Sequence, residues 1–239
     1  MLKLNKIKEA FEWANKFGYK ELIKKPFYLL FAPIIIRFHP KHKFKVKNKD
    51  YDLFYHRYNF TWLKERGIEI PFFFAQVNSN RGRKLEVGNV LSHYFKPEWD
   101  IVDKYEKGRG VINEDINTFN PEKKYDLIFS ISTFEHIGWD EYGEEQREKS
   151  SEKIQTSFKN LKDNCLKKSG KIIISVPIGW NPKMDEIIFS NKLLFKEIIF
   201  LKRVGKTNWL QVNKQEAKNS KYGKPFPHAN CVAFGIYQE

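Results

Sequence analysis

The chain is poor in cysteine and has no long apolar run. Only Cys165 and Cys231 occur among its 239 residues, and their separation offers neither a disulfide framework nor the spacing of a structural zinc site. We therefore expect a reducing, cytoplasmic compartment and no bound metal. The most apolar run, Phe27–Ile36, contains Pro33 and is about half as long as a membrane-spanning helix. Residues 1–20 are charged throughout, so we expect neither a secretory leader nor a transmembrane segment.

Acidic residues are scarce near the start of the chain. Residues 1–50 contain thirteen Lys and Arg against four Asp and Glu, which gives +9 of the total formal charge of +14. A basic, aromatic-rich segment favours an anionic partner such as a membrane surface or a nucleic acid. The alternative is a set of solvated lysines. Likewise, Phe27–Ile36 could rest on anionic lipid or pack on the main domain as a lid.

Short apolar runs alternate with helical patterns from residue 83 onward, which predicts an α/β fold with a mostly parallel, doubly wound sheet. We expect an antiparallel edge strand at the carboxyl end and a helical, basic N-terminal extension. The predicted domains are residues 1–82 and 83–239. The predicted strands are residues 84–88, 99–103, 111–115, 125–132, 171–177, 198–212 and 230–237. The predicted helices are residues 1–24, 144–168 and 185–194.

Polar or small residues follow the predicted strands at their carboxyl ends. In doubly wound sheets ligands bind beyond these ends. One crevice should therefore be lined by Glu86, Gly88, Asp103, Asp115, Ser132 and Glu135.

The loop after the first of these strands lacks the glycines of a dinucleotide site. It reads GNVLSH where the dinucleotide fingerprint has GxGxxG, so its backbone cannot approach a pyrophosphate closely, which argues against NAD and FAD. An acid at the end of the next strand, Asp103, is placed to accept hydrogen bonds from ribose hydroxyls. A nucleoside cofactor without phosphates is compatible with this pattern.

Four short motifs carry a family resemblance. EVG, VDKYE, NEDI and DLIFSISTFEHIG, in this order, resemble S-adenosylmethionine-dependent methyltransferases of the Rossmann-like class, and LKKSGKIIISVP resembles the segment after that family's long helix. The resemblance covers roughly residues 83–185. With the segment ERGIEIP before the first strand included, the chain is similar to methyltransferase-like proteins of surface-polysaccharide gene clusters.

The resemblance implies S-adenosylmethionine as cofactor and assigns residues to it. Glu86 and Gly88 would hold its amino-acid end, with Asn89 beside them and backbone N–H groups of a helix start facing its carboxylate. Asp103 would bind the ribose. The adenine and the transferred methyl would be bordered by Asp115, Ile116, Ser132 and Thr133.

His136 is the leading candidate for a base that removes a proton from an acceptor hydroxyl. Glu135 is the second catalytic candidate. The remaining candidates are Asp140, His93 and His228. A histidine after a strand is also a common structural residue, so both interpretations stay open. Arg66 and Glu69 could fold over the crevice or form a salt-bridged connector.

These residues predict a methyltransferase for a small-molecule or glycan acceptor, with a hydroxyl as the methylated group. Two alternatives remain. The basic segment could grip nucleic acid, or the protein could bind the cofactor without turnover, because Val90 and Ser92 stand where the family has its last two glycines.

Overall fold

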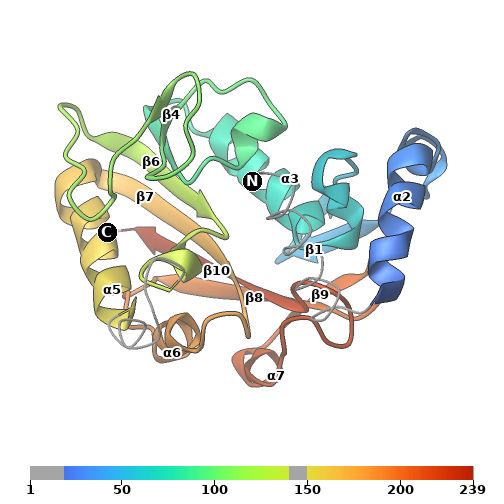
Figure 1. Ribbon diagram of the computed structural model, residues 1–239. Coiled ribbons are helices and arrows are strands. Elements are labelled where there is room, and N and C mark those ends of the chain that lie inside the picture. The colour runs from blue at the N-terminus through green and yellow to red at the C-terminus, as the bar shows by residue number, and fades with distance from the viewer. Residues whose placement is uncertain (1–18, 140–149, 239) are drawn as a thin grey trace.

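A computed structural model describes residues 19–139 and 150–238. Its centre is an eight-stranded sheet with the order β5-β4-β3-β6-β7-β10-β8-β9 (Figure 1). The strands are β3 (Lys84–Val87), β4 (Asp100–Val102), β5 (Val111–Ile112), β6 (Tyr125–Ile131), β7 (Leu166–Pro177), β8 (Glu197–Arg203), β9 (Trp209–Val212) and β10 (Cys231–Gln238).

Strands β5, β4, β3, β6 and β7 are mutually parallel, as the apolar runs predict. Strand β10 is antiparallel to both of its neighbours, β7 and β8, which confirms its predicted direction. Its predicted place at the edge is wrong, because β9 forms that edge. The physical reason is that Cys231–Phe234 is buried on both faces of the sheet, and such a strand needs neighbours on both sides.

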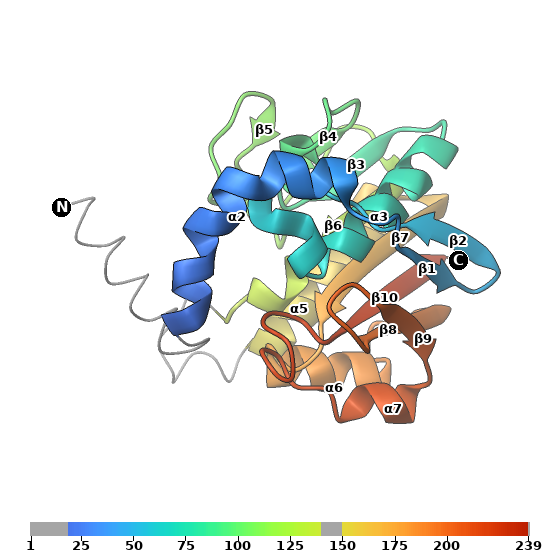
Figure 2. The ribbon, with the colours of Figure 1, turned by 90° about the vertical axis from the view of Figure 1, so that its right-hand side faces the viewer.

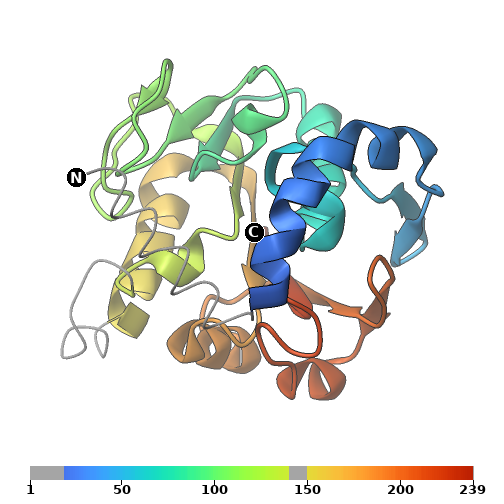
Figure 3. The ribbon, with the colours of Figure 1, turned by 45° about the vertical axis from the view of Figure 1, so that its right-hand side comes forward.

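Two hydrophobic layers cover the sheet. One face carries the helices α5 (Ser150–Asn160), α6 (Pro182–Ser190) and α7 (Lys214–Lys218), and the other carries α3 (Arg66–Ser79) (Figures 1 and 3). Alternation along β6 follows from its period of two: Ile128 packs with the first layer, whereas Leu127 and Phe129 pack with α3.

Helix α3 was not among the predicted helices, and it carries Pro71 in its interior. Proline usually breaks a helix because it lacks an N–H for the carbonyl four residues earlier. Here that carbonyl, Gly67 O, accepts a hydrogen bond from Phe54 N at 2.9 Å instead. The helix therefore continues through Pro71 and buries Phe72, Phe73 and Val77.

The segment before α3 forms a helix and a hairpin. Helix α2 (Tyr19–Phe38) lies on the outer side of the 3₁₀ segment Tyr58–Leu63, where the ring centroids of Tyr28 and Phe60 are 5.9 Å apart. The hairpin of β1 (Lys43–Val46) and β2 (Lys49–Asp52) lies beside β9 (Figure 2). Ala32 is buried, but Leu30, Ile34 and Phe38 are exposed. Among the described residues, every helix is too short or too polar to cross a bilayer. Most of the predicted helix at residues 1–24 lies outside the described residues.

The segment leading into β7 differs from the sequence-based expectation. Helix α5 ends at Asn160 and continues as one π-turn, Leu161–Cys165, so Gly170 is not a helix stop. Strand β7 starts at Leu166, which pairs with Tyr125. The register with β6 then shifts, so that the next paired residues are Leu127 and Lys171. Residues 144–149 of the predicted helix lie outside the described residues.

Because α3 shares its core with the sheet, we expect Phe73→Ala to lower the free energy of unfolding by roughly 3–5 kcal/mol. Phe73 is fully buried and packs near Phe129 and Phe234. The control is Asn78→Ala on the exposed side of the same helix, with an expected change within about 0.5 kcal/mol. Denaturant unfolding measures both. A small effect of Phe73→Ala would favour the predicted domain boundary at residue 82, with α3 in a separate cap.

Candidate functional site

A cavity of about 270 Å³ lies beyond the carboxyl ends of β3, β4, β5 and β6. Its apolar walls come from Val87, Val102, Ile116 and Ile137, and its polar lining comes from Asp103, Lys104, Glu114, Asp115, Thr133, His136 and Lys153. A mostly apolar cavity with a few converging polar groups is typical of a small-ligand site.

Six of the predicted site residues meet in this cavity although they are spread over 49 positions of the chain. They are Gly88, Asp103, Asp115, Ile116, Thr133 and His136. Each lies just after a parallel strand or within a few residues of its end, and those ends share one edge of the sheet. The other four, Glu86, Asn89, Ser132 and Glu135, are not part of the cavity lining.

Position 88 requires glycine because of its backbone conformation and because Thr133 lies close to it. Its φ is +85°, and a Cβ placed there would meet Thr133 Oγ1 at 2.2 Å. Any other residue would therefore be strained and would clash. The glycine lets the chain turn from β3 directly under the β6 end.

Glu86 does not face the cavity. Its carboxylate accepts hydrogen bonds from Val90 N at 2.9 Å, Leu91 N at 2.6 Å and Trp99 Nε1 at 2.7 Å. The role of Glu86 at the amino-acid end of a ligand stays a prediction, and the N–H groups that were expected at a helix start lie in a shorter element. Only a 3₁₀ turn, Leu91–His93, follows, and two of the loop N–H groups are already bound.

Asp103 is fixed by the loop that follows β4. Its Oδ1 accepts from Tyr105 N at 2.8 Å and Glu106 N at 2.7 Å, and its Oδ2 accepts from Asn89 N at 3.3 Å. A carboxylate oxygen accepts more than one hydrogen bond, so Oδ2 keeps capacity for a ligand hydroxyl. Asn89 acts as a link, because its side chain also donates to Glu106 Oε1 at 2.8 Å.

Asp115 already has partners on both oxygens. Lys104 Nζ lies 3.1 Å from Asp115 Oδ2, and Asn117 N donates to Oδ1 at 2.9 Å. About a third of each ionic side chain is exposed, so this pair contributes little to stability. Ile116 is buried and supplies a flat apolar wall beside it.

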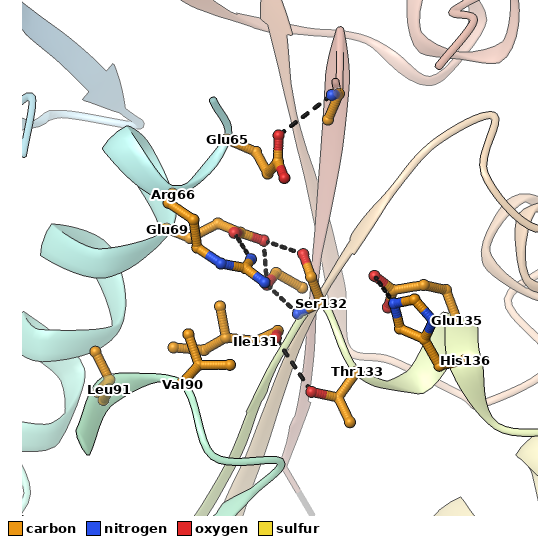
Figure 4. Close-up of polar contacts among 12 residues, drawn as sticks. Glu65, Arg66, Glu69, Val90, Leu91, Ile131, Ser132, Thr133, Glu135 and His136 are labelled. Carbon is orange, nitrogen blue, oxygen red and sulfur yellow. Dashed lines mark hydrogen bonds and ion pairs between the residues drawn. The ribbon is translucent and has the colours of Figure 1, made fainter. Parts of the chain in front are cut away.

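Ser132 turns away from the cavity toward α3. Its φ is 42°, and its Oγ donates to Glu69 Oε1 at 2.6 Å (Figure 4). That Ser132 and Thr133 border a transferred group stays a prediction. Thr133 does line the cavity, and its Oγ1 donates to Ile131 O at 3.2 Å.

Glu69 is the centre of a buried network that the sequence only partly indicated. It pairs with Arg66, and Ser175 Oγ donates to its Oε1 at 2.7 Å. Glu65 was missed: it is buried and accepts from Ala229 N at 3.2 Å. Although burial opposes ionisation, Arg66 and His228 hold the pKa of Glu65 below its usual range.

Glu135 and His136 lie on the short turn after β6. Glu135 is 1% exposed, and its Oε2 has no hydrogen-bond partner among the residues that the structure describes. Burial raises its pKa well above the usual range, with a further contribution from Glu69. His136 Nε2 lies 3.8 Å from Glu135 Oε1, and its side chain is 45% exposed and reaches the cavity.

The weaker candidates are elsewhere. His93 pairs with Glu106 at 3.1 Å on the exposed side of the loop, and Asp140 lies outside the described residues. Within residues 19–139 and 150–238, no group of three or more side chains is arranged to hold a metal ion. Lys104 and Lys153 line the cavity but were not predicted as site residues, because a lysine carries no positional signal in a single sequence.

No family model and no curated protein matches this chain. Among solved structures it is similar to the N-methyltransferase NodS from Bradyrhizobium japonicum WM9 with S-adenosyl-L-homocysteine, at 9% identity and a TM-score of 0.41, over 72% of this chain and 89% of that one. It is also similar to an S-adenosylmethionine-dependent methyltransferase from Clostridium acetobutylicum, at 12% identity and a TM-score of 0.37, over 70% and 89%. Scores this low carry no argument about activity, and the fold class rests on the sheet order itself.

The pH dependence of stability tests the position of Glu86. Burial raises the pKa of this residue from 4.5 to about 7, so the folded state binds the proton more tightly than the unfolded state. Its contribution to the free energy of unfolding therefore falls as pH rises from about 4.5 to 7. We expect the free energy of unfolding of Glu86→Gln to rise by roughly 3 kcal/mol relative to that of the wild type as the pH increases across this interval. Guanidinium unfolding measures both. Parallel curves for the two proteins would contradict this, and exposed Glu98→Gln is the control.

Proposed function

We propose that this protein is an S-adenosylmethionine-dependent methyltransferase that acts on a small-molecule or glycan acceptor. The observation that carries the proposal is the convergence of Gly88, Asp103, Ile116, Thr133 and His136 on one cavity at the carboxyl edge of the parallel strands. This is the position in which doubly wound sheets bind nucleosides.

The residues present fit the nucleoside half of the cofactor. Asp103 Oδ2 would accept from a ribose hydroxyl, and Val102, Ile116 and Ile137 would enclose the adenine. The tight contact of Gly88 with Thr133 leaves the cavity floor flat, where a side chain would fill it. At the amino-acid end the fit is different, because Glu86 already binds the N–H groups of Val90 and Leu91.

When bound, S-adenosylmethionine supplies a methyl group on a sulfonium that a nucleophile can take. The chain would contribute alignment, which is the larger part of such a rate enhancement. We propose a hydroxyl as the methylated group and His136 as the base that takes its proton. Glu135 Oε1, 3.8 Å from His136 Nε2, would stabilise the charge that forms on the imidazole.

Calorimetric titration with S-adenosylhomocysteine tests the cofactor site. We expect saturable binding by the wild type, weakened by roughly 1–3 kcal/mol in Asp103→Ala because a charge-assisted hydrogen bond is lost. Asp50→Ala, an exposed acid of β2 far from the cavity, should bind as the wild type does. Absence of binding by the wild type, or equal binding by Asp103→Ala, would refute the proposed site.

A binding protein without turnover is the second candidate. It is favoured by the loop at Val90, whose N–H group is bound by Glu86 and so is withdrawn from a ligand carboxylate. Cofactor binding combined with no methyl transfer to any member of an acceptor panel would favour this candidate over the enzyme.

We also propose that α2 docks on an anionic membrane surface. Leu30, Ile34 and Phe38 are 73%, 54% and 74% exposed and recur every four residues, so they form one apolar stripe. A nucleic-acid partner has less support, because lysines of the hairpin already face acids: Lys43 lies 4.0 Å from Asp52. Residues 1–18 of the basic segment lie outside the described residues.

Vesicle co-sedimentation tests the membrane proposal. We expect the wild type to bind vesicles that contain phosphatidylserine, less so as salt screens the lysines. Replacing both Leu30 and Phe38 by Glu should abolish this binding, since two charges would enter the lipid interface. Leu210→Glu, at an apolar β9 residue that is 56% exposed, is the matched control. Equal loss of binding in the control would show a non-specific effect of charge.

A further inference from the structure

Three buried carboxylates act on one guanidinium. Arg66 forms an ion pair with Glu69, and the charges of Glu65 and Glu135 also act electrostatically on it. We call these four residues the carboxylate cluster (Figure 4). A buried surplus of negative charge is unfavourable unless something positive compensates it. The nearby Arg203 does not fill this role for Glu135, because its guanidinium donates to the carbonyls of Gly205, Lys206 and Pro227.

The hydrogen-bond donors of the cluster are already used. Arg66, Ser132 and Ser175 donate to Glu69, and the N–H group of Ala229 donates to Glu65. Glu135 is left with Oε2 unpartnered among the described residues, at 1% exposure. In its ionised form Glu135 lacks a donor at this position, so a ligand group that stabilises this form must donate hydrogen bonds.

Aromatic rings lie next to this acid. His136 is 5.8 Å from Trp180 between ring centroids, and Trp180 is 4.8 Å from Tyr222 in an edge-to-face arrangement. Asn181 anchors this wall to the turn, because its Nδ2 donates to the backbone carbonyl of Glu135 at 2.7 Å. The faces of aromatic rings attract cations. The carboxylate of Glu135 and the aromatic rings beside it therefore both favour a positively charged ligand group.

We propose that the acceptor carries a protonated amine, and that Glu135 and the wall of Trp180 and Tyr222 bind this ammonium group. This rests on the proposed function, since it names the chemistry of the acceptor for that site. His136 belongs to both parts, because it lines the cofactor cavity and contacts Trp180. The ammonium group is held beside the cavity, and the rest of the acceptor extends toward His136. An acceptor recognised through a carboxylate of its own is disfavoured, because it would place a further carboxylate beside those of the cluster.

Proton linkage supports this assignment. Burial holds the pKa of Glu135 well above its usual range, and Glu69 and Glu65 add to the shift while Arg66 opposes it. The other titratable groups near this acid are His136 on the same turn and Tyr222 on the aromatic wall. An arriving cation would displace the proton of Glu135. Binding should therefore tighten as pH rises, as long as the amine stays protonated.

Methylammonium chloride is the probe, because it carries the recognised group and nothing else. The readout is the carboxyl ¹³C resonance of Glu135 in the full chain, identified by its absence in Glu135→Gln. We expect methylammonium to shift this resonance toward its ionised position. Sodium chloride at equal ionic strength, methanol and acetate should not. Affinity for methylammonium, measured for all variants by calorimetric titration, should fall about tenfold in Glu135→Gln, equivalent to roughly 1.4 kcal/mol.

Two further variants make the outcome decisive. Trp180→Leu should weaken binding about two- to fivefold, as expected for loss of a cation–π contact, and it decides the question if Glu135→Gln does not fold. Glu197→Gln, an acid of β8 paired with Lys47, should bind methylammonium as the wild type does. Equal responses to methylammonium, sodium and methanol, or unchanged affinity in both site variants, would overturn the proposal. Titration with S-adenosylhomocysteine separates this failure from failure of the cofactor site, which Glu135 does not line.

Discussion

The burial of Glu69 is the constraint on which the arrangement of this molecule depends. A charged carboxylate with no exposed surface is tolerated in a protein only where donors surround it. The donors are Arg66 on the same helix and the hydroxyls of Ser132 and Ser175 from the ends of β6 and β7. Helix α3 can therefore lie in only one position, with its first turn over those two strand ends. Removing Arg66 would leave the buried charge of Glu69 uncompensated, which is far more costly than losing a surface ion pair.

The same network divides the crevice into two halves of different chemistry. Ser132 is held in a left-handed conformation by its bond to Glu69, and the next residues turn so that Thr133 and His136 reach the cavity. On one side the walls are apolar, and the acids are bound by backbone N–H groups. On the other side Glu135 is buried and short of a donor. A nucleoside suits the first half and a cationic group suits the second, so His136 at the boundary can contact both ligands.

The sequence predicted the half of the site that follows strand ends. Apolar runs locate parallel strands, and the residues after them meet at one edge, which is why Asp103, Asp115 and His136 were found. It could not predict where side chains of neighbouring elements turn. Glu86 and Ser132 follow strands as well, but each bonds to a loop or helix that a linear pattern does not position. Helix α3 was missed because the compensation for Pro71 comes from Phe54, thirteen residues from the Gly67 carbonyl.

Because Val90 and Ser92 replace glycines, different contacts hold the loop after β3, and this changes how a ligand can be bound. Within the loop at residues 88–93, Gly88 has a backbone conformation that demands glycine. Val90 has side-chain bulk, and its N–H group and that of Leu91 turn inward to Glu86. An amino-acid-bearing ligand in this cavity would therefore have to bind its carboxylate through other groups of the lining, such as the lysine side chain of Lys153, in place of these N–H groups. Lysine is a flexible point charge, whereas backbone N–H groups are fixed donors. Affinity for that end of the ligand then depends on charge and falls with ionic strength, while affinity for the nucleoside depends on the shape of the apolar walls.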